Sequence, residues 1–578
     1  MQPAAMRVSL SMAVMAVMLR STMVNGTIGM MMRMKTIWIT IFSETKNKMK
    51  TRYVKAVSAA FVGLLLFSSC ANEMTTQPDA QQQTDTLKQY VTFRGYQPVI
   101  TPAASTRTTA THEKGRPIKV NWSVGDKIWV KATDGNFYQS EAATFPNPSD
   151  HTQANFKLPA GHDYGFNPEV RYTNTGNPNR VEILHNQSQT TIGRFDHLGV
   201  SGDCGVAIAE GGGGDYHFTL KHKSAFICIY PRIENEALHH NVKLKSLYID
   251  EMYGELPAGT MDFTDGTLIG KTPTPVYSQI ELDTHNAPIP SATRNDTCFF
   301  VAISPKNHSL ALGFRIIDPT TNVSITIDNR PWWFVNMEEG KVYDYTAWLD
   351  KDIDHYKPVY YMWDALKSYW DAPGVVQPTL RDQVGSGAAT SPSDIRWFNQ
   401  APAPNVATRS ASEMPNANLM YWYVAKGEPR YDEFKPWSAF GHLYTSGTWY
   451  LRKSVIAAKN GHAGDEGYLD RFSPDGYDRR NPANVAGSYV IYNEGAGAVQ
   501  DGAPVTNKED YFFLPSLGYY AGNQMNFIGI TGTYWTSNAN GVGYHLTVGK
   551  WGVKIARVDF CSQSLGFPKW KFETRYGY

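Results

Sequence analysis

The stretch IKVNWSVGDKIWV, residues 118–130, alternates apolar and polar side chains on both sides of a Gly125-Asp126 pair. Alternation with a period of two is typical of a strand with one buried face, and a Gly-Asp pair between two such runs predicts a turn. Similar short runs, bounded by Gly, Asn, Asp or Pro, recur to Trp348, while helical periodicity is scarce. We therefore predict a mainly β chain built from sandwich-type sheets.

Two tandem β-sandwiches are expected before residue 351, over residues 89–214 and 215–350. Ala225–Tyr230 and Val242–Ile249 have the composition of strands of the second unit, and Gly340–Tyr345 that of its closing strand. The glycines of 211–214 lie just before this unit and suggest a link or a loop near it.

The composition shifts after Asp350. Nine of the fifteen tryptophans fall between residues 351 and 578, Gly, Asn and Tyr become more frequent, and strand-like runs are short with long loops between them. We predict a separate, loop-rich α+β domain over 351–578.

Residues 49–70 have the pattern of a bacterial lipoprotein signal peptide. A basic start at Met49–Lys55 is followed by the apolar run Ala56–Phe67 and by Ser68-Ser69-Cys70. The apolar run is too short to span a bilayer. It could instead be a short buried helix, but that interpretation leaves the basic start and the Ser-Ser-Cys end unexplained. We expect 49–69 to be removed, Cys70 to carry lipid, and 70–88, which is rich in Gln and Thr, to be a flexible tether.

Residues 1–48 hold ten of the nineteen methionines and no acidic residue before Glu44. Because a signal peptide starts a few residues before its apolar run, Met49 is the expected start, and 1–48 is interpreted as an extension from a misplaced start codon.

The overall composition argues against several partner classes. The 54 basic and 53 acidic residues nearly cancel, and no basic stripe is visible, so nucleic acid is not an expected partner. The cysteines after Cys70 are widely spaced and form no CxxC, which argues against a zinc knuckle or a disulfide framework. Cys228 and Cys298 lie in apolar runs and are expected to be buried thiols.

Two ordered sets of motifs resemble known families. The first comprises Val91–Phe93, Thr106–Thr108, Trp122–Val130, Leu220–Ala225 and Gly340–Tyr343. It resembles the fimbrillin-like proteins of Bacteroidetes, the subunits of type V pili, over roughly residues 88–350. This resemblance implies two β-sandwiches in a surface lipoprotein that is held in the outer membrane by its lipid (a palmitate-type anchor) and belongs to a fimbrium.

The second set lies in 351–578 and comprises Phe513–Tyr519, Gly529–Ser537 and Gly566–Pro568, with Gly447–Leu451 as a Trp-centred strand. It resembles the C-type-lectin-like module of the Fibrobacter major paralogous family. The arginine that usually closes this module is not clear here, and Arg575 is a loose match.

The fimbrillin resemblance implies assembly by strand exchange, in which an amino-terminal strand is cut away and the carboxy-terminal segment of a neighbour fills the groove. Here Val91–Tyr96 is the candidate strand, and Arg107 or Arg116 the candidate processing site, although both arginines also suit solvated loops. A carboxy terminus folded into a lectin-like domain is poorly placed to donate a strand. The chain is therefore expected to receive a strand from shaft subunits, as at a pilus tip.

No catalytic motif is recognisable, so we predict no enzyme, cofactor or metal. His239-His240 is interpreted as a surface pair. Formylglycine-generating enzymes share the lectin-like fold, but they rely on two cysteines and this domain offers only Cys561. The acidic residues Asp465, Glu466, Asp470, Asp475 and Asp478 could collect calcium, but their spacing favours a solvated loop.

Ligand binding is expected in the last domain, because exposed aromatic rings stack on sugars and supply large contact areas. Trp370, Trp422 and Trp551 are the candidates, and the ligand is a glycan or a host or bacterial surface protein. Two other readings stay open: a surface glycan-binding lipoprotein for nutrient capture that does not polymerise, and a hydrolase or modifying enzyme with an unrecognised site.

Overall fold

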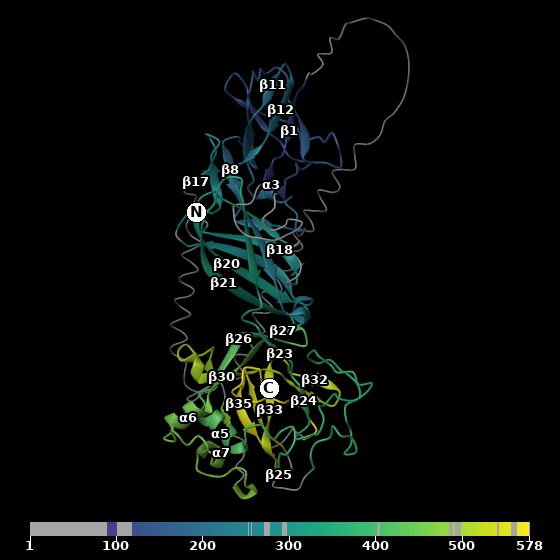
Figure 1. Cartoon of the computed structure of the whole chain (residues 1–578), viewed down its shortest axis with the longest axis vertical. Helices are drawn as coiled ribbons and strands as arrows, with labels where there is room; N and C mark the ends of the chain where they lie inside the picture. The colour runs from purple at the N-terminus through teal and green to yellow at the C-terminus, as the bar shows by residue number, and fades with distance from the viewer. Residues whose placement is uncertain are drawn as a thin grey trace, which may run out of the picture. The chain divides into compact units, whose positions relative to one another are not determined.

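The computed structural model describes residues 90–576 except 101–117, 253, 256, 271–277, 292–297, 401–404, 485–488, 492–498, 540–542 and 557–562. The chain is mainly β, with short helices between many sheets (Figure 1). In the described part, no helix is both long and apolar enough to cross a membrane. The fold class expected from the period-two alternation is confirmed.

Two sheets share the amino-terminal core. The first has the order β11–β12–β1–β6, formed by Glu210–Gly212, Asp215–Thr219, Val91–Tyr96 and Gln153–Leu158. The second has the order β13–β10–β7–β4–β5, formed by Lys221–His222, Gly205–Ile208, Glu169–Tyr172, Trp129–Lys131 and Phe137–Gln139. The turn predicted near Gly125 is present, with Trp122 buried before it and β4 after it.

Strand β1 lies between two neighbours, parallel to β12 and antiparallel to β6. Phe93 is fully buried and stacks on Tyr216 with ring centroids 4.3 Å apart. Gly95 faces the same core so closely that a Cβ there would lie 2.6 Å from Phe218 and 2.9 Å from Phe156. The prediction of a paired strand with alternate side chains buried is therefore confirmed.

A second group of sheets follows. One has the order β19–β14–β22, formed by Phe299–Ile303, Ala225–Arg232 and Val342–Trp348. A larger one has the order β21–β20–β15–β18–β9, formed by Val323–Asn336, Asn307–Asp318, Lys243–Glu251, Gln279–Pro288 and Asn186–Ser188. A small one joins β17, β16 and β8, formed by Ile269–Gly270, Gly259–Asp262 and Arg180–Ile183.

Strand β14 is buried on both faces, which explains its unbroken apolar sequence. Ile227 and Ile229 face the core shared with the larger sheet, whereas Phe226 and Cys228 face a smaller cluster with Leu198 of helix α3, Leu198–Ser201. Cys228 and Cys298 are buried free thiols in this smaller cluster, as predicted.

The boundary predicted between residues 214 and 215 does not coincide with the sheet pairing. Strand β12 begins at Asp215 and pairs with β1 of the amino-terminal sheets. Strands β8 and β9, which precede residue 214, pair instead with β16 and β18 of the second group. The chain thus passes between the two groups of sheets more than once.

Two larger sheets and three helices form the carboxy-terminal region. One sheet has the order β23–β26–β27–β30, formed by Asp354–Tyr356, Arg430–Ala439, His442–Leu451 and Tyr511–Pro515, with β29, Gln500–Asp501, beside β26. The other has the order β25–β33–β34–β35–β28, formed by Asn405–Val406, Thr531–Ala539, Gly543–Gly549, Gly552–Ala556 and Tyr489–Ile491.

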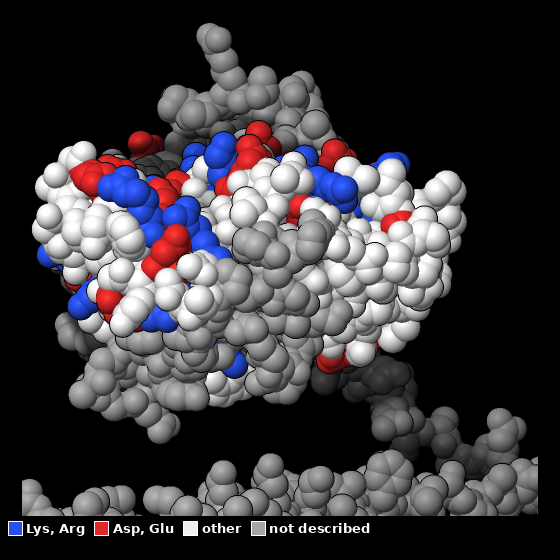
Figure 2. Space-filling view, turned by 90° about the horizontal axis from the view of Figure 1, so that it is seen from below, with Lys and Arg blue, Asp and Glu red and all other residues white. Residues whose placement is uncertain are grey.

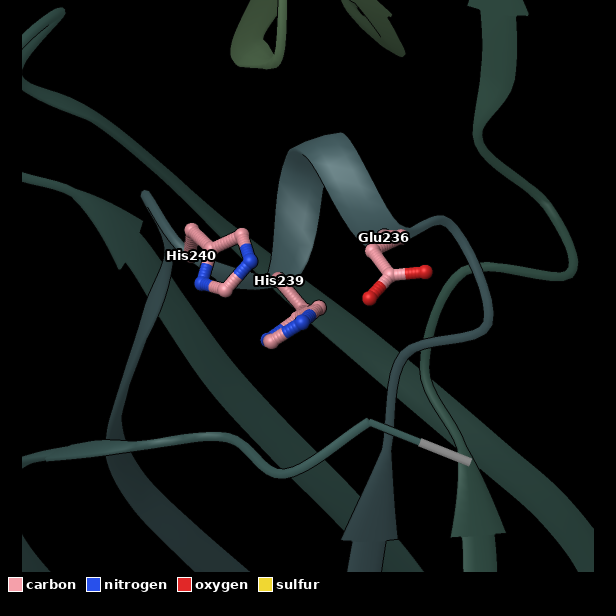
Figure 3. A group of neighbouring side chains, drawn as sticks. All are labelled: Glu236, His239 and His240. Atoms are coloured by element: carbon pink, nitrogen blue, oxygen red, sulfur yellow. The ribbon is translucent and has the colours of Figure 1, made fainter. Parts of the chain in front are cut away.

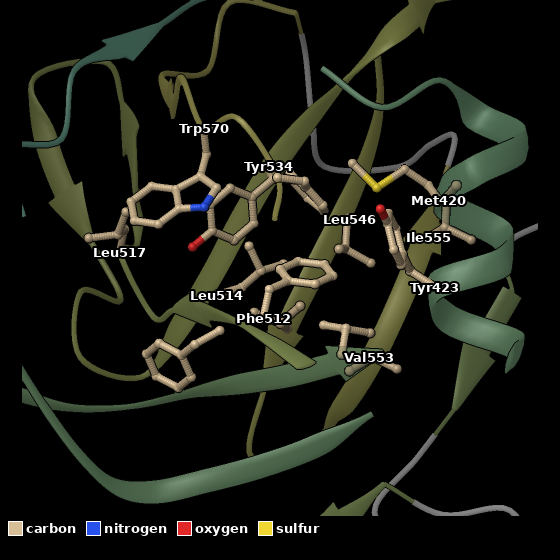
Figure 4. Close-up of a cluster of buried hydrophobic side chains, with 14 of the residues drawn as sticks. Met420, Tyr423, Phe512, Leu514, Leu517, Tyr534, Leu546, Val553, Ile555 and Trp570 are labelled. Atoms are coloured by element: carbon tan, nitrogen blue, oxygen red, sulfur yellow. The ribbon is translucent and has the colours of Figure 1, made fainter. Parts of the chain in front are cut away.

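Helix α5, Ala417–Lys426, begins where the Asn416 side chain accepts a hydrogen bond from the Leu419 N–H, and ends at Gly427. It is buried from Ala417 to Val424, and Met420 and Tyr423 face side chains of both sheets (Figure 4). Two shorter helices, α6 at Lys453–Lys459 and α7 at Tyr468–Arg471, lie beside it. This aromatic-rich core explains why tryptophan and tyrosine are concentrated after residue 351.

The carboxy terminus is held within this region. Strand β36, Phe567–Pro568, pairs with β24, Tyr360–Tyr361. Trp570 and Phe572 are buried, and Arg575 forms an ion pair with Asp354 at 2.9 Å.

The turn between β26 and β27 packs against the second group of sheets. Leu443 is fully buried in the core of that group. Asp318, at the end of β20, accepts hydrogen bonds from His442 Nδ1 at 2.9 Å and from the Leu443 N–H at 3.0 Å. Burial by itself raises the pKa of Asp318, but these hydrogen bonds outweigh it and hold the pKa below its usual value.

Candidate functional site

Two of the three tryptophans predicted to touch ligand are core residues. Trp370 packs edge-on against Tyr520, with ring centroids 5.1 Å apart, and Trp422 donates its indole N–H to the Phe472 carbonyl at 2.7 Å. Both belong to the main apolar cluster and are less than 10% exposed. This corrects the prediction for both residues, because the indole rings serve the core rather than an open surface.

Trp551 is different, because 67% of it is exposed. It lies in the two-residue turn between β34 and β35. The adjacent Lys550 forms an ion pair at 3.3 Å with Glu433, whose neighbour Phe434 is 79% exposed. Each exposed ring is therefore one residue away in sequence from a partner of this salt bridge, and we call Phe434 and Trp551 together the aromatic patch.

A bulge in β26 presents Phe434. The pairing of β26 with β27 shifts register between Asp432 and Pro436. The Asp432 carboxylate accepts hydrogen bonds from the backbone N–H of Phe434 and from the Trp449 indole N–H, at 3.1 and 3.0 Å. Phe434 was not predicted from the sequence, although a proline inside a strand-like run is a recognisable sign of a bulge.

A cleft of about 530 Å³ opens beside the sheet β23–β26–β27–β30. Trp449 and Phe513 line it with ring centroids 5.0 Å apart. Its charged lining consists of Asp352, Asp354, Lys435, Arg452, Lys508 and Arg575. No sequence motif indicated this cleft, since its residues come from five separate segments.

Four of the five acidic residues considered for calcium, all but Glu466, are matched by cations. Asp465 binds Arg471, Asp470 binds Lys453, Asp475 binds Arg479 and Asp478 binds Arg480. The hydrogen bond from Arg480 lowers the pKa of Asp478 to about 2. Figure 2 shows basic and acidic side chains alternating over one half of the displayed face, with few charges on the other half. A calcium ion would have to displace these ion pairs.

Glu236, His239 and His240 are grouped on helix α4, Glu236–His239, and the residue after it (Figure 3). Their ligand atoms lie within 4.8 Å of one another, and such nitrogen and oxygen ligands suit zinc. The two imidazole rings, however, lie one over the other, with centroids 3.9 Å apart and planes 37° apart. Because stacked rings do not aim their lone pairs at one point, we assign no metal to this group.

Ser304, His308 and Glu251 have the spacing of a hydrolase triad. His308 Nε2 lies 3.2 Å from Ser304 Oγ, and Nδ1 lies 3.0 Å from Glu251 Oε2. All three are buried, and His308 Nε2 also lies 2.9 Å from the Ser304 carbonyl. Nε2 thus faces the Ser304 carbonyl as well as the Ser304 hydroxyl, whereas a general base would aim it at the hydroxyl alone. This group is structural.

Three predicted sites lie outside the described residues: the lipid attachment at Cys70 and the processing sites at Arg107 and Arg116. Cys561 lies outside them too.

No family model matches the chain. No curated protein matches it either. Among solved structures, a proposed cell adhesion protein of Bacteroides ovatus aligns at 14% identity over 44% of this chain and 91% of its own, with a TM-score of 0.28. A fimbrial protein of Bacteroides ovatus aligns at 11% identity over 83% and 98%, with a TM-score of 0.23. A fimbrial assembly protein of Parabacteroides distasonis aligns at 10% identity over 45% and 91%, with a TM-score of 0.22. TM-scores this low do not establish a common fold.

Proposed function

We propose that this chain is a cell-surface lipoprotein that acts as a fimbrial adhesin subunit, at the tip of the fimbrium. The observation that carries the proposal is the position of β1, which pairs with β12 on one side and with β6 on the other. Removal of β1 would leave the edges of β12 and β6 unpaired and the pocket of Phe93 empty. Only another strand can pair with both edges and also fill the pocket. Processing after Arg107 or Arg116 would release β1.

The carboxy terminus supports a position at the end of a chain of subunits. Strand β36 is paired, and Arg575 is tied to Asp354. The Glu573 carboxylate accepts hydrogen bonds from the Tyr423 hydroxyl and the Lys453 N–H. A segment with these contacts cannot leave as a donor strand without disrupting its own core. The subunit would then receive a strand from a shaft subunit and give none.

The carboxy-terminal region, which we take to be C-type-lectin-like, would bind the ligand. The aromatic patch is suited to this role, since exposed rings provide contact area for a sugar face or an apolar protein surface at low entropic cost. Lipid on Cys70 would hold the unassembled subunit at the outer membrane.

Binding of the soluble chain, residues 71–578, to glycan and surface-protein arrays tests this role. We expect specific binding that Trp551→Ala or Phe434→Ala weakens at least tenfold, because each removes an exposed ring from the contact. Val505→Ala, at a site that is 90% exposed, is the matched control and should bind normally. A chain that binds nothing, or binds equally well without both rings, would contradict the adhesin assignment.

The second candidate function is a glycan-binding surface lipoprotein that does not polymerise. It shares the aromatic patch but requires β1 to stay in place. The fate of β1 in the mature protein separates the two functions.

A further inference from the structure

We propose that the cleft beside Trp449 binds a carboxylated sugar, of the uronic or sialic acid type. This inference rests on the proposed adhesin function and names the ligand class of the carboxy-terminal region. It concerns a site other than the aromatic patch.

The cleft has an aromatic floor. Trp449 on β27 and Phe513 on β30 are paired across the two strands, and their rings are in contact. Both rings are less than 10% exposed, and Lys508 lies over the Trp449 ring, so the face of that ring opens only when Lys508 moves. Side chains alternate along a strand, and the neighbouring Tyr450 and Leu514 are fully buried and do not line the cleft, whereas Phe512 lines it as well. The volume of about 530 Å³ lies in the range of small-ligand sites.

Part of the positive charge in the cleft is already matched. Asp354 binds Lys435 at 2.8 Å and Arg575 at 2.9 Å. These two cations therefore hold β23, β26 and the carboxy terminus together, and are not available to a ligand without loss of that contact.

Two other cations are not matched. Arg452 donates from Nε to the Glu509 carbonyl and from Nη1 to the Glu573 carbonyl, both at 2.9 Å. The Lys508 ammonium lies 4.9 Å from the centroid of the Trp449 ring. Within the described part of the chain, neither has an ion pair with a carboxylate, and the carboxylates of Glu509 and Asp510 do not line the cleft.

Lys508 and Arg452 are neighbours, because Arg452 contacts the carbonyl of the residue that follows Lys508. Together they offer an anion two cationic donors above an apolar floor, where hydrogen bonds to charged groups are strong. An exposed lysine held only by a ring can exchange that contact for a carboxylate.

A sugar fits this arrangement better than an acidic peptide does. Its ring face can lie against the aromatic floor while its carboxylate meets Lys508 and Arg452, and the exposed Asp352 can accept hydrogen bonds from hydroxyl groups. The acidic side chains of a peptide would instead be repelled by Asp352 and would leave the floor uncovered.

The test is calorimetric titration of the soluble chain, residues 71–578, with a hyaluronan hexasaccharide and with sialyllactose. We expect at least one to bind, and its carboxyl-reduced, neutral form to bind at least tenfold more weakly. Lys508→Glu should weaken binding of the acid at least tenfold, and Lys508→Arg should keep most of it. Lys367→Glu is the matched control, since Lys367 is exposed and does not line the cleft.

The inference would be overturned if neither acid bound, or if the carboxyl-reduced forms bound as tightly as the acids. It would also be overturned if Lys508→Glu had no effect on binding or if Lys367→Glu weakened binding equally. Tighter binding of oligo-aspartate than of either sugar would overturn it too. If the chain binds a neutral glycan or a protein through the aromatic patch while the acids fail, the carboxylated-sugar site is excluded and the adhesin function stands.

Discussion

A chain from which β1 has been excised is expected to lose the cooperative fold of its amino-terminal sheets, and to regain it when a synthetic peptide of residues 90–100 is added. Excision removes hydrogen bonds to both β12 and β6 together with the Phe93 ring, whose truncation to alanine alone costs about 3–5 kcal/mol. Excision of the whole segment 90–100 also removes Gln97, whose side-chain oxygen lies 3.0 Å from Nε2 of the buried His222. Size-exclusion chromatography and chemical denaturation would measure loss and rescue.

Two point variants of the intact chain serve as a matched pair. Phe93→Ala should lower the free energy of unfolding by several kcal/mol. Arg94→Ala should change it by less than about 1 kcal/mol, because Arg94 is exposed and its ion pair with Asp215 spans 3.5 Å at the surface. An excised chain that stays folded and monomeric without peptide would mean that β1 is dispensable.

The second large effect concerns His308 and Glu251. His308→Ala is expected to lower the free energy of unfolding by about 3–5 kcal/mol, because it leaves the Glu251 carboxylate buried without its main partner. Equilibrium denaturation followed by tryptophan fluorescence would measure the loss. His217→Ala is the control, since His217 is exposed beside Glu210 and should matter little. A hydrolase would instead lose activity with little loss of stability, which would reverse the structural assignment of this group.

Local patterns in the sequence predicted much of the β structure. The alternation around Val91–Phe93 identified β1, and the apolar run at Ala225 identified β14. Burial of Cys228 and Cys298 followed from their apolar neighbours. These features depend on a few adjacent residues, so they are visible in the sequence.

Features that depend on distant partners were not predictable. Nothing near Asp215 shows that β12 pairs with β1 more than a hundred residues earlier, and nothing near β8 or β9 shows that they pair with β16 and β18, so the sheet pairing around residues 214 and 215 was not visible in the sequence. Trp370, Trp422 and Trp551 lie outside the recognised motifs, and the packing of the whole region shows which one is exposed. The cleft near Lys508 brings together five segments that share no local pattern.

The proposal that this subunit ends a fimbrium is tested most directly by electron microscopy of mixtures. The chain cleaved after Arg107 is added to growing polymers of a fimbrial shaft subunit, and polymer length is measured against the added concentration. We predict shorter polymers that carry one copy of this chain at a single end, and no polymers when the cleaved chain is incubated alone, because its carboxy-terminal segment is held by β24 and Asp354. Long homopolymers of the cleaved chain would contradict the tip assignment, and unchanged shaft polymers would contradict strand acceptance.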